Sequence, residues 1–133
     1  MIGLLIVTHC DLGRELINAA EFIVGRLVAA EAISITQTST SEDIRRMIKG
    51  KIRTLDSGNG VLILTDMFGG TPSNLSFSFL KEDVVEVLTG VNLPMVIAIS
   101  QNRSEMKLSE LAEKAREAGA NSISLAGKLL ESE

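Results

Sequence analysis

The sequence predicts an α/β fold: a single doubly wound, mostly parallel sheet with helices on both faces. Residues 2–7 and 61–64 are continuously apolar rather than alternating, which is typical of strands buried on both faces of a parallel sheet. Segments with apolar residues at helical spacing separate the strands, and right-handed crossovers of this kind join parallel strands. We expect one domain over residues 1–133, because this length fits a single core.

The first part of the chain alternates strand and helix. After the strand at 2–7, apolar residues at helical spacing over 11–27 predict a helix with Asp11 as its N-cap. Residues 31–36 alternate like a half-buried strand. Capping residues at the start of segment 38–55 then precede a second helical pattern.

The middle of the chain repeats this order. Residues 56–60 form a turn signal before the strand at 61–64, which Thr65 and Asp66 close. Thr71 is then predicted as an N-cap and Pro72 as the first helical residue.

The last part contains a fourth short strand at 84–88 and a helix at 92–100 that Pro94 helps to start. An amphipathic helix follows from Glu105 and is predicted to stop at Gly119. A short apolar run at 123–125 remains as a candidate strand.

Composition excludes several function classes. The net charge is -4 and basic residues are scattered, so no nucleic-acid partner is expected. The apolar segments are too short to span a bilayer, so no membrane insertion is expected. One cysteine and one histidine cannot form an internal disulfide or a zinc site, which favours a cytoplasmic location and predicts neither a metal nor a cofactor.

His9 and Asp66 are the candidate catalytic pair. They follow the ends of the first and third strands, and ligands of doubly wound folds bind at those ends, where the strand order reverses. A neutral imidazole is a good nucleophile near neutral pH, and a carboxylate on its other nitrogen would fix the tautomer and stabilise positive charge. Read alone, His9 is a common loop residue and Asp66 a common turn residue; their pairing favours catalysis.

An anion site is predicted beside this pair. Free N–H groups at the helix start around residues 71–74 would bind a phosphoryl group, and Gly69 and Gly70 would allow close approach of the backbone. The glycine pair is also compatible with an ordinary tight turn. Cys10 is interpreted as packed or incidental, since adjacent side chains usually point apart.

Three motifs carry a family resemblance, in the segments 3–9 (GLLIVTH), 64–74 (LTDMFGGTPSN) and 89–95 (TGVNLPM). Together they resemble the mannose-family EIIA domain of the bacterial phosphoenolpyruvate-dependent sugar phosphotransferase system (PTS). The resemblance extends over nearly the whole chain.

The resemblance implies a phosphohistidine carrier. His9 would accept a phosphoryl group from the phosphocarrier HPr and pass it to a separate EIIB protein for sugar uptake, with Asp66 beside it. Thr71 matches a residue that contacts the phosphoryl group, and Ser73, Gly69 and Gly70 are assigned to the same phosphate-binding set.

The resemblance also implies residues near the site and a dimer. Phe68 stands where some members have tryptophan, and Thr8 precedes the histidine. Members commonly form homodimers that exchange a C-terminal strand, for which residues 123–125 are the candidate. Many members have glycine after the active-site histidine, where this chain has Cys10; its side chain would narrow the pocket or change partner contacts.

Three alternatives stay open at this stage. The chain resembles the phosphocarrier subunit of dihydroxyacetone kinase in its expected fold and in its histidine after the first strand. A regulatory EIIA, whose phosphorylation state is sensed without transport, would use the same His9. A structural or ligand-binding flavodoxin-like domain would transfer nothing. The sugar, if any, is not encoded in these motifs.

Overall fold

Four parallel strands form the sheet of the computed structural model, which describes residues 1–131. Their order is β2-β1-β3-β4, so β1 and β3 are the central neighbours, and the direction in which successive strands are added to the sheet reverses between them. The strands are β1 (Gly3–His9), β2 (Ala30–Ile35), β3 (Val61–Thr65) and β4 (Val85–Thr89).

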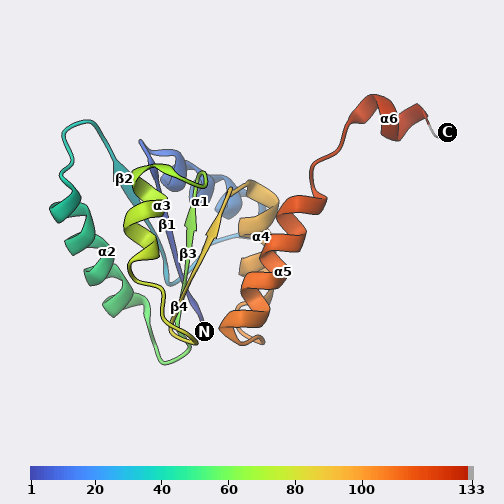
Figure 1. Ribbon diagram of the computed structural model, residues 1–133. Coiled ribbons are helices and arrows are strands. Elements are labelled where there is room, and N and C mark those ends of the chain that lie inside the picture. The colour runs from blue at the N-terminus through green and yellow to red at the C-terminus, as the bar shows by residue number, and fades with distance from the viewer. Residues whose placement is uncertain (132–133) are drawn as a thin grey trace.

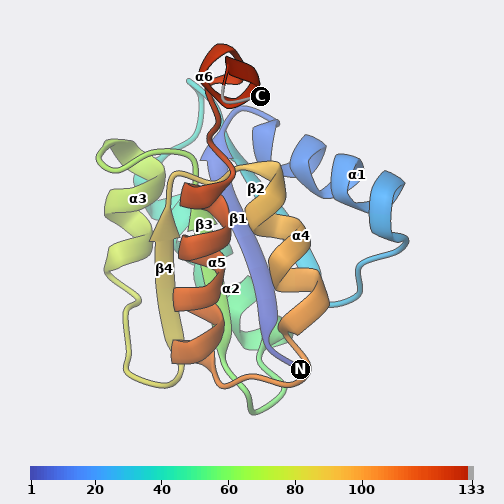
Figure 2. The ribbon, with the colours of Figure 1, turned by 90° about the vertical axis from the view of Figure 1, so that its right-hand side faces the viewer.

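Helices cover both faces of the sheet, which confirms the predicted fold class (Figure 1 and Figure 2). α1, α4 and α5 pack on one face, and α2 and α3 on the other. Within residues 1–131, no helix has the length and apolar character needed to cross a bilayer. The helices are α1 (Leu12–Val24), α2 (Ser41–Leu55), α3 (Gly70–Phe77), α4 (Leu93–Asn102), α5 (Leu108–Asn121) and α6 (Ala126–Glu131).

The continuous apolar run of β1 supplies two cores at once. Leu4 and Ile6 pack beneath α1, α4 and α5, whereas Leu5 and Val7 pack beneath α2 and α3. Each of the four side chains is 0% exposed. Because successive residues of a strand point to opposite faces, a strand covered on both sides must be apolar at every position. The strand ends are therefore the first places where polar side chains reach solvent.

Two helices begin where capping residues predicted them. The Thr40 hydroxyl accepts a hydrogen bond from the Asp43 N–H at 3.1 Å at the start of α2. The Asn92 side chain accepts one from the Met95 N–H at 3.1 Å at the start of α4, where Pro94 lies in the first turn. Each cap satisfies an N–H that has no intrahelical partner.

Arg103, at the end of α4, binds the backbone at the amino-terminal ends of β1 and β2. The side chain is only 4% exposed. Its guanidinium donates to the carbonyl oxygens of Ile2, Val28 and Ala29 at 2.5–2.9 Å. Burial lowers the pKa of Arg103 from its usual value. The segments that precede β1 and β2 are thereby both bound to one cation at the end of α4.

α5 begins at Leu108 rather than at Glu105, and three further predicted helix boundaries were wrong at glycines. α1 ends at Val24 rather than Leu27, because the chain turns at Gly25 with φ 89°. α3 begins at Gly70, after Gly69 with φ 83°, so Thr71 is not its N-cap. α5 continues past Gly119, where glycine makes room: a Cβ there would lie 2.7 Å from the Met95 methyl carbon.

The C-terminal strand expected at residues 123–125 is also not formed in this chain. These residues lead into α6, which projects from the body of the domain (Figure 1). Ile123 is 81% exposed and Leu125 is 71% exposed. A strand needs a partner edge for its backbone hydrogen bonds, and the segment leaves the sheet instead of following β4.

Candidate active site

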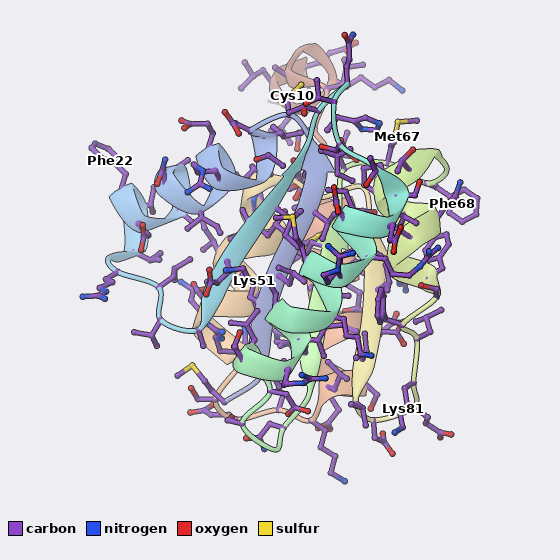
Figure 3. All side chains as sticks on the ribbon, turned by 90° about the vertical axis from the view of Figure 1, so that its left-hand side faces the viewer. Cys10, Phe22, Lys51, Met67, Phe68 and Lys81 are labelled. Carbon is purple, nitrogen blue, oxygen red and sulfur yellow. The ribbon has the colours of Figure 1, made fainter. Side chains whose placement is uncertain are left out.

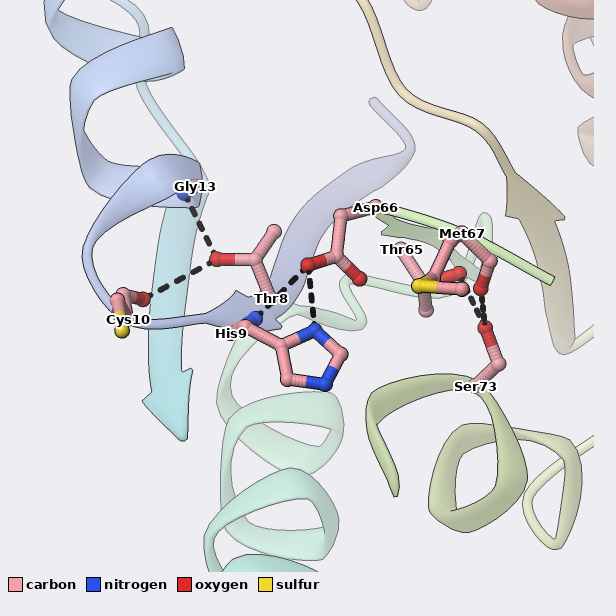
Figure 4. Close-up of polar contacts among 8 residues, drawn as sticks. All are labelled: Thr8, His9, Cys10, Gly13, Thr65, Asp66, Met67 and Ser73. Carbon is pink, nitrogen blue, oxygen red and sulfur yellow. Dashed lines mark hydrogen bonds and ion pairs between the residues drawn. The ribbon is translucent and has the colours of Figure 1, made fainter. Parts of the chain in front are cut away.

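His9 and Asp66 meet at the carboxyl ends of β1 and β3. His9 is the last residue of β1, and Asp66 follows the last residue of β3. One carboxylate oxygen, Asp66 Oδ2, lies 2.8 Å from the imidazole Nδ1 and accepts the His9 backbone N–H at 2.9 Å (Figure 4). The adjacency of β1 and β3 puts the two side chains in contact, as the expected strand order requires.

The protonation state of Asp66 follows from its surroundings. Burial alone would raise the pKa of this carboxyl, but hydrogen bonds from the His9 backbone and imidazole, together with the imidazole's charge, hold it below the usual value of 3.8. Asp66 is therefore ionised at neutral pH and can only accept hydrogen bonds. Its other oxygen, Oδ1, is buried and has no hydrogen-bond partner within residues 1–131.

An ionised acceptor at Nδ1 fixes the imidazole. Nδ1 must carry the ring proton to donate to Asp66, which leaves the lone pair on Nε2. The His9 side chain is 49% exposed, whereas that of Asp66 is 12% exposed. In Figure 4, Nε2 points away from Asp66 and toward the α3 side of the site. The site therefore presents one nucleophilic nitrogen to the outside.

The start of α3 lies against this nitrogen. A Cβ on Gly70 would lie 3.3 Å from His9 Cε1 and 3.6 Å from Nε2, so the Gly70 backbone borders the ring edge. Its φ of 78° is in the region that favours glycine. The first N–H groups of a helix have no intrahelical partner, so those of Gly70 and Thr71 are available to an anion. Thr71 itself is exposed.

Thr8 and Cys10 shape the turn that follows β1. The Thr8 hydroxyl is buried, accepts the Gly13 N–H at 2.9 Å and donates to the Cys10 carbonyl at 3.2 Å. Cys10 is exposed and has φ 52°, in the left-handed region. That backbone conformation explains why glycine would suit this position. The thiol points away from the imidazole (Figure 4).

Two exposed apolar side chains lie on the loop between β3 and α3. Met67 is 52% exposed and Phe68 is 77% exposed (Figure 3). The Phe68 ring contacts that of Phe77, with centroids 5.8 Å apart. The loop that carries Asp66 thus has an exposed apolar rim, formed by Met67 and Phe68, directly after the carboxylate in sequence.

Ser73 lies elsewhere than the sequence predicts. It is assigned to phosphate binding, but its side chain is 0% exposed. Its hydroxyl donates to the Met67 carbonyl in a short hydrogen bond and lies 2.7 Å from the Thr65 hydroxyl. The Ser73 hydroxyl therefore faces the inside of the loop rather than the imidazole. Sequence reasoning gave Thr65 no part in the site beyond closing β3.

No group of three side chains suited to a metal ion occurs in the part of the chain described, residues 1–131.

Comparison with known proteins places these features in a family. The family model EIIA-man, described as "PTS system fructose IIA component", matches residues 3–116. The Escherichia coli (strain K12) protein YadI, provisionally named a phosphotransferase enzyme IIA component, is 33% identical over 93% of this chain and 86% of its own. The fructose-specific EIIA component of Bacillus subtilis (strain 168) is 26% identical over 98% of this chain and 90% of its own.

Solved structures agree on the fold. The EIIA component from Streptococcus agalactiae superimposes with a TM-score of 0.88 at 24% identity, over 96% of this chain and 99% of that one. A PTS IIA protein associated with a fucose utilization operon in Streptococcus pneumoniae gives a TM-score of 0.80 at 26% identity, over 96% and 95%.

Proposed function

Because this chain belongs to the mannose-family EIIA components of the sugar phosphotransferase system, we propose that His9 is its phosphoryl carrier. In this proposal, His9 accepts a phosphoryl group from phospho-HPr and delivers it to a separate EIIB protein. The observation that supports it most directly is the 2.8 Å contact between Nδ1 and Asp66, which leaves Nε2 as the free nucleophile.

In this proposal, His9, Asp66 and the start of α3 each have a role in the transfer. The Nε2 lone pair attacks phosphorus while the bond to the donor breaks, so a P–N bond forms on His9 and the donor leaves with its electron pair. The imidazole gains positive charge, which the Asp66 carboxylate stabilises through Nδ1–H. The N–H groups beside Gly70 and Thr71 bind the phosphoryl oxygens at the start of α3, with Gly69 giving the chain its turn. Transfer to EIIB reverses these steps.

The rest of the proposal concerns partners. Met67 and Phe68 form the exposed apolar rim that both proteins would meet. HPr as donor, EIIB as acceptor, a homodimer and a cytoplasmic location stay predictions.

Labelled phosphoenolpyruvate tests the carrier role directly. The chain is incubated with the general PTS enzyme and HPr, and acid-labile label on the chain is measured. His9→Ala should take up no label, whereas Cys10→Ser, which alters the neighbouring exposed residue, should label at the wild-type rate. Adding unlabelled EIIB should then remove the label. A His9→Ala variant that still carries acid-labile phosphate would refute the assignment.

A further inference from the structure

We propose that the buried hydroxyls of Thr65 and Ser73 are positioning residues that hold the Asp66 carboxylate against the imidazole. This inference rests on the proposed function of His9 and extends it. Neither hydroxyl touches the imidazole or the place where a phosphoryl group would lie. Their effect on His9 is exerted through the loop that carries Asp66.

The donors in this network can be assigned. The Met67 carbonyl can only accept a hydrogen bond, so the Ser73 hydroxyl donates its hydrogen to this carbonyl. The 2.7 Å contact between Ser73 and Thr65 must then use the Thr65 hydrogen. The result is a chain of donation from Thr65 to Ser73 to the Met67 carbonyl, in which each hydrogen has one place to go. Both side chains are 0% exposed, so water does not compete.

The hydrogen bonds of Ser73 hold the residues on both sides of Asp66. Thr65 precedes Asp66 and Met67 follows it, and Ser73 on α3 binds to both neighbours. The Asp66 side chain accepts two hydrogen bonds from His9 at Oδ2, while Oδ1 has no hydrogen-bond partner within residues 1–131. The carboxylate therefore depends on its backbone for orientation. The same bonds join the loop to α3, whose first residue, Gly70, borders the ring.

α3 supplies a matched control. Ser76 lies one turn after Ser73, is also 0% exposed, and its hydroxyl has no partner within residues 1–131. Ser76→Ala and Ser73→Ala thus remove the same atom from equally buried sites on one helix. Only Ser73→Ala breaks hydrogen bonds.

Substitutions at Thr65 separate hydrogen bonding from packing. Thr65→Val keeps the branched shape and loses the hydroxyl, whereas Thr65→Ser keeps the hydroxyl and loses the methyl group. If the hydroxyl positions Asp66, the valine variant is impaired and the serine variant is not. A purely packing role predicts the reverse.

Two measurements read the effect. His9 is the only histidine in the chain, so its ring nitrogen signals in ¹⁵N NMR are unambiguous and report the ratio of the two neutral tautomers. Ser73→Ala and Thr65→Val should lower the preference for the Nδ1–H tautomer about fivefold, which corresponds to about 1 kcal/mol for one neutral hydrogen bond. Transfer from phospho-HPr should slow by about the same factor at saturating HPr, with an unchanged KM.

The outcomes are distinct. Wild-type tautomer ratios and rates in Ser76→Ala and Thr65→Ser, with losses in the other two variants, support the proposal. Ser73→Ala and Thr65→Val that match Ser76→Ala in both measurements overturn it. The NMR measurement needs no phosphoryl donor. If the wild type took up no label from HPr, the proposed function would fail while the positioning role would still be decided.

Discussion

Replacing Asp66 by alanine should slow phosphorylation of His9 by about a hundredfold without unfolding the chain. Asp66 Oδ2 accepts both the His9 N–H at 2.9 Å and Nδ1 at 2.8 Å, and the second bond strengthens as the ring becomes positive. A hydrogen bond to a charged group contributes about 1.5–3 kcal/mol. Because about 1.4 kcal/mol corresponds to a tenfold change in rate, losing this hydrogen bond should slow phosphorylation by about 10–100-fold. We expect the larger value because the imidazole is then also free to adopt the other tautomer.

Asp66→Asn separates the contribution of the negative charge from that of the tautomer. An asparagine oxygen can still accept both hydrogen bonds, so the tautomer is kept and only the negative charge is lost. We expect a reduction of about tenfold, the difference between a charged and a neutral acceptor.

Single-turnover transfer from phospho-HPr measures both variants, with circular dichroism as the check on folding. Equal rates for wild type and Asp66→Ala would remove the carboxylate from the mechanism. Equal rates for the alanine and asparagine variants would show that the charge, and not the tautomer, accounts for the whole effect.

The remaining predictions concern stability. Arg103→Met should lower the free energy of unfolding by about 3 kcal/mol in urea titrations, because the carbonyl oxygens of Ile2, Val28 and Ala29 lose a charged donor; a loss under about 1 kcal/mol would contradict this stabilising role of the guanidinium. Cys10→Gly should raise it by about 0.5 kcal/mol by relieving the left-handed backbone at φ 52°, and any decrease would contradict that reasoning. The lowered pKa of Asp66 implies a stabilising contribution that is complete above the usual carboxyl value of 3.8 and is lost as the pH falls through the lowered value. The stability difference between wild type and Asp66→Asn should therefore shrink below about pH 4, and a difference that stays constant to pH 2 would show that the carboxylate is not stabilised in the fold.

The sequence was sufficient for the four strands of the sheet and for the contact between His9 and Asp66, although it also indicated a strand at 123–125 that does not form in this chain. Strands buried on both faces are uniformly apolar, so their ends are visible as the first polar residues. Once the strand order is the common doubly wound one, the ends of β1 and β3 must be neighbours. The contact thus follows from hydrophobic patterning and topology, and no long-range information about side chains is needed.

Features that depend on distant partners could not be predicted. Ser73 reads as a phosphate ligand from its place after a glycine pair, and only the seating of α3 on β3 turns its hydroxyl toward Thr65 and Met67. Arg103 binds a carbonyl 101 residues away, and no local pattern marks it as buried. The start of α3 was misplaced because Thr71-Pro72 has favourable capping chemistry, whereas Gly69 and Gly70 adopt the positive φ values that begin the helix earlier.

The two hydrogen bonds from His9 to one oxygen of Asp66 also determine where the phosphoryl donor and acceptor can bind. The backbone N–H and Nδ1 both bind Asp66 Oδ2, so the ring cannot turn over without losing that contact. In the proposed transfer, the phosphoryl group on Nε2 must then leave from the same face of the site at which it arrived. HPr and EIIB would compete for one binding surface. Slow dissociation of HPr after phosphorylation would therefore delay transfer to EIIB.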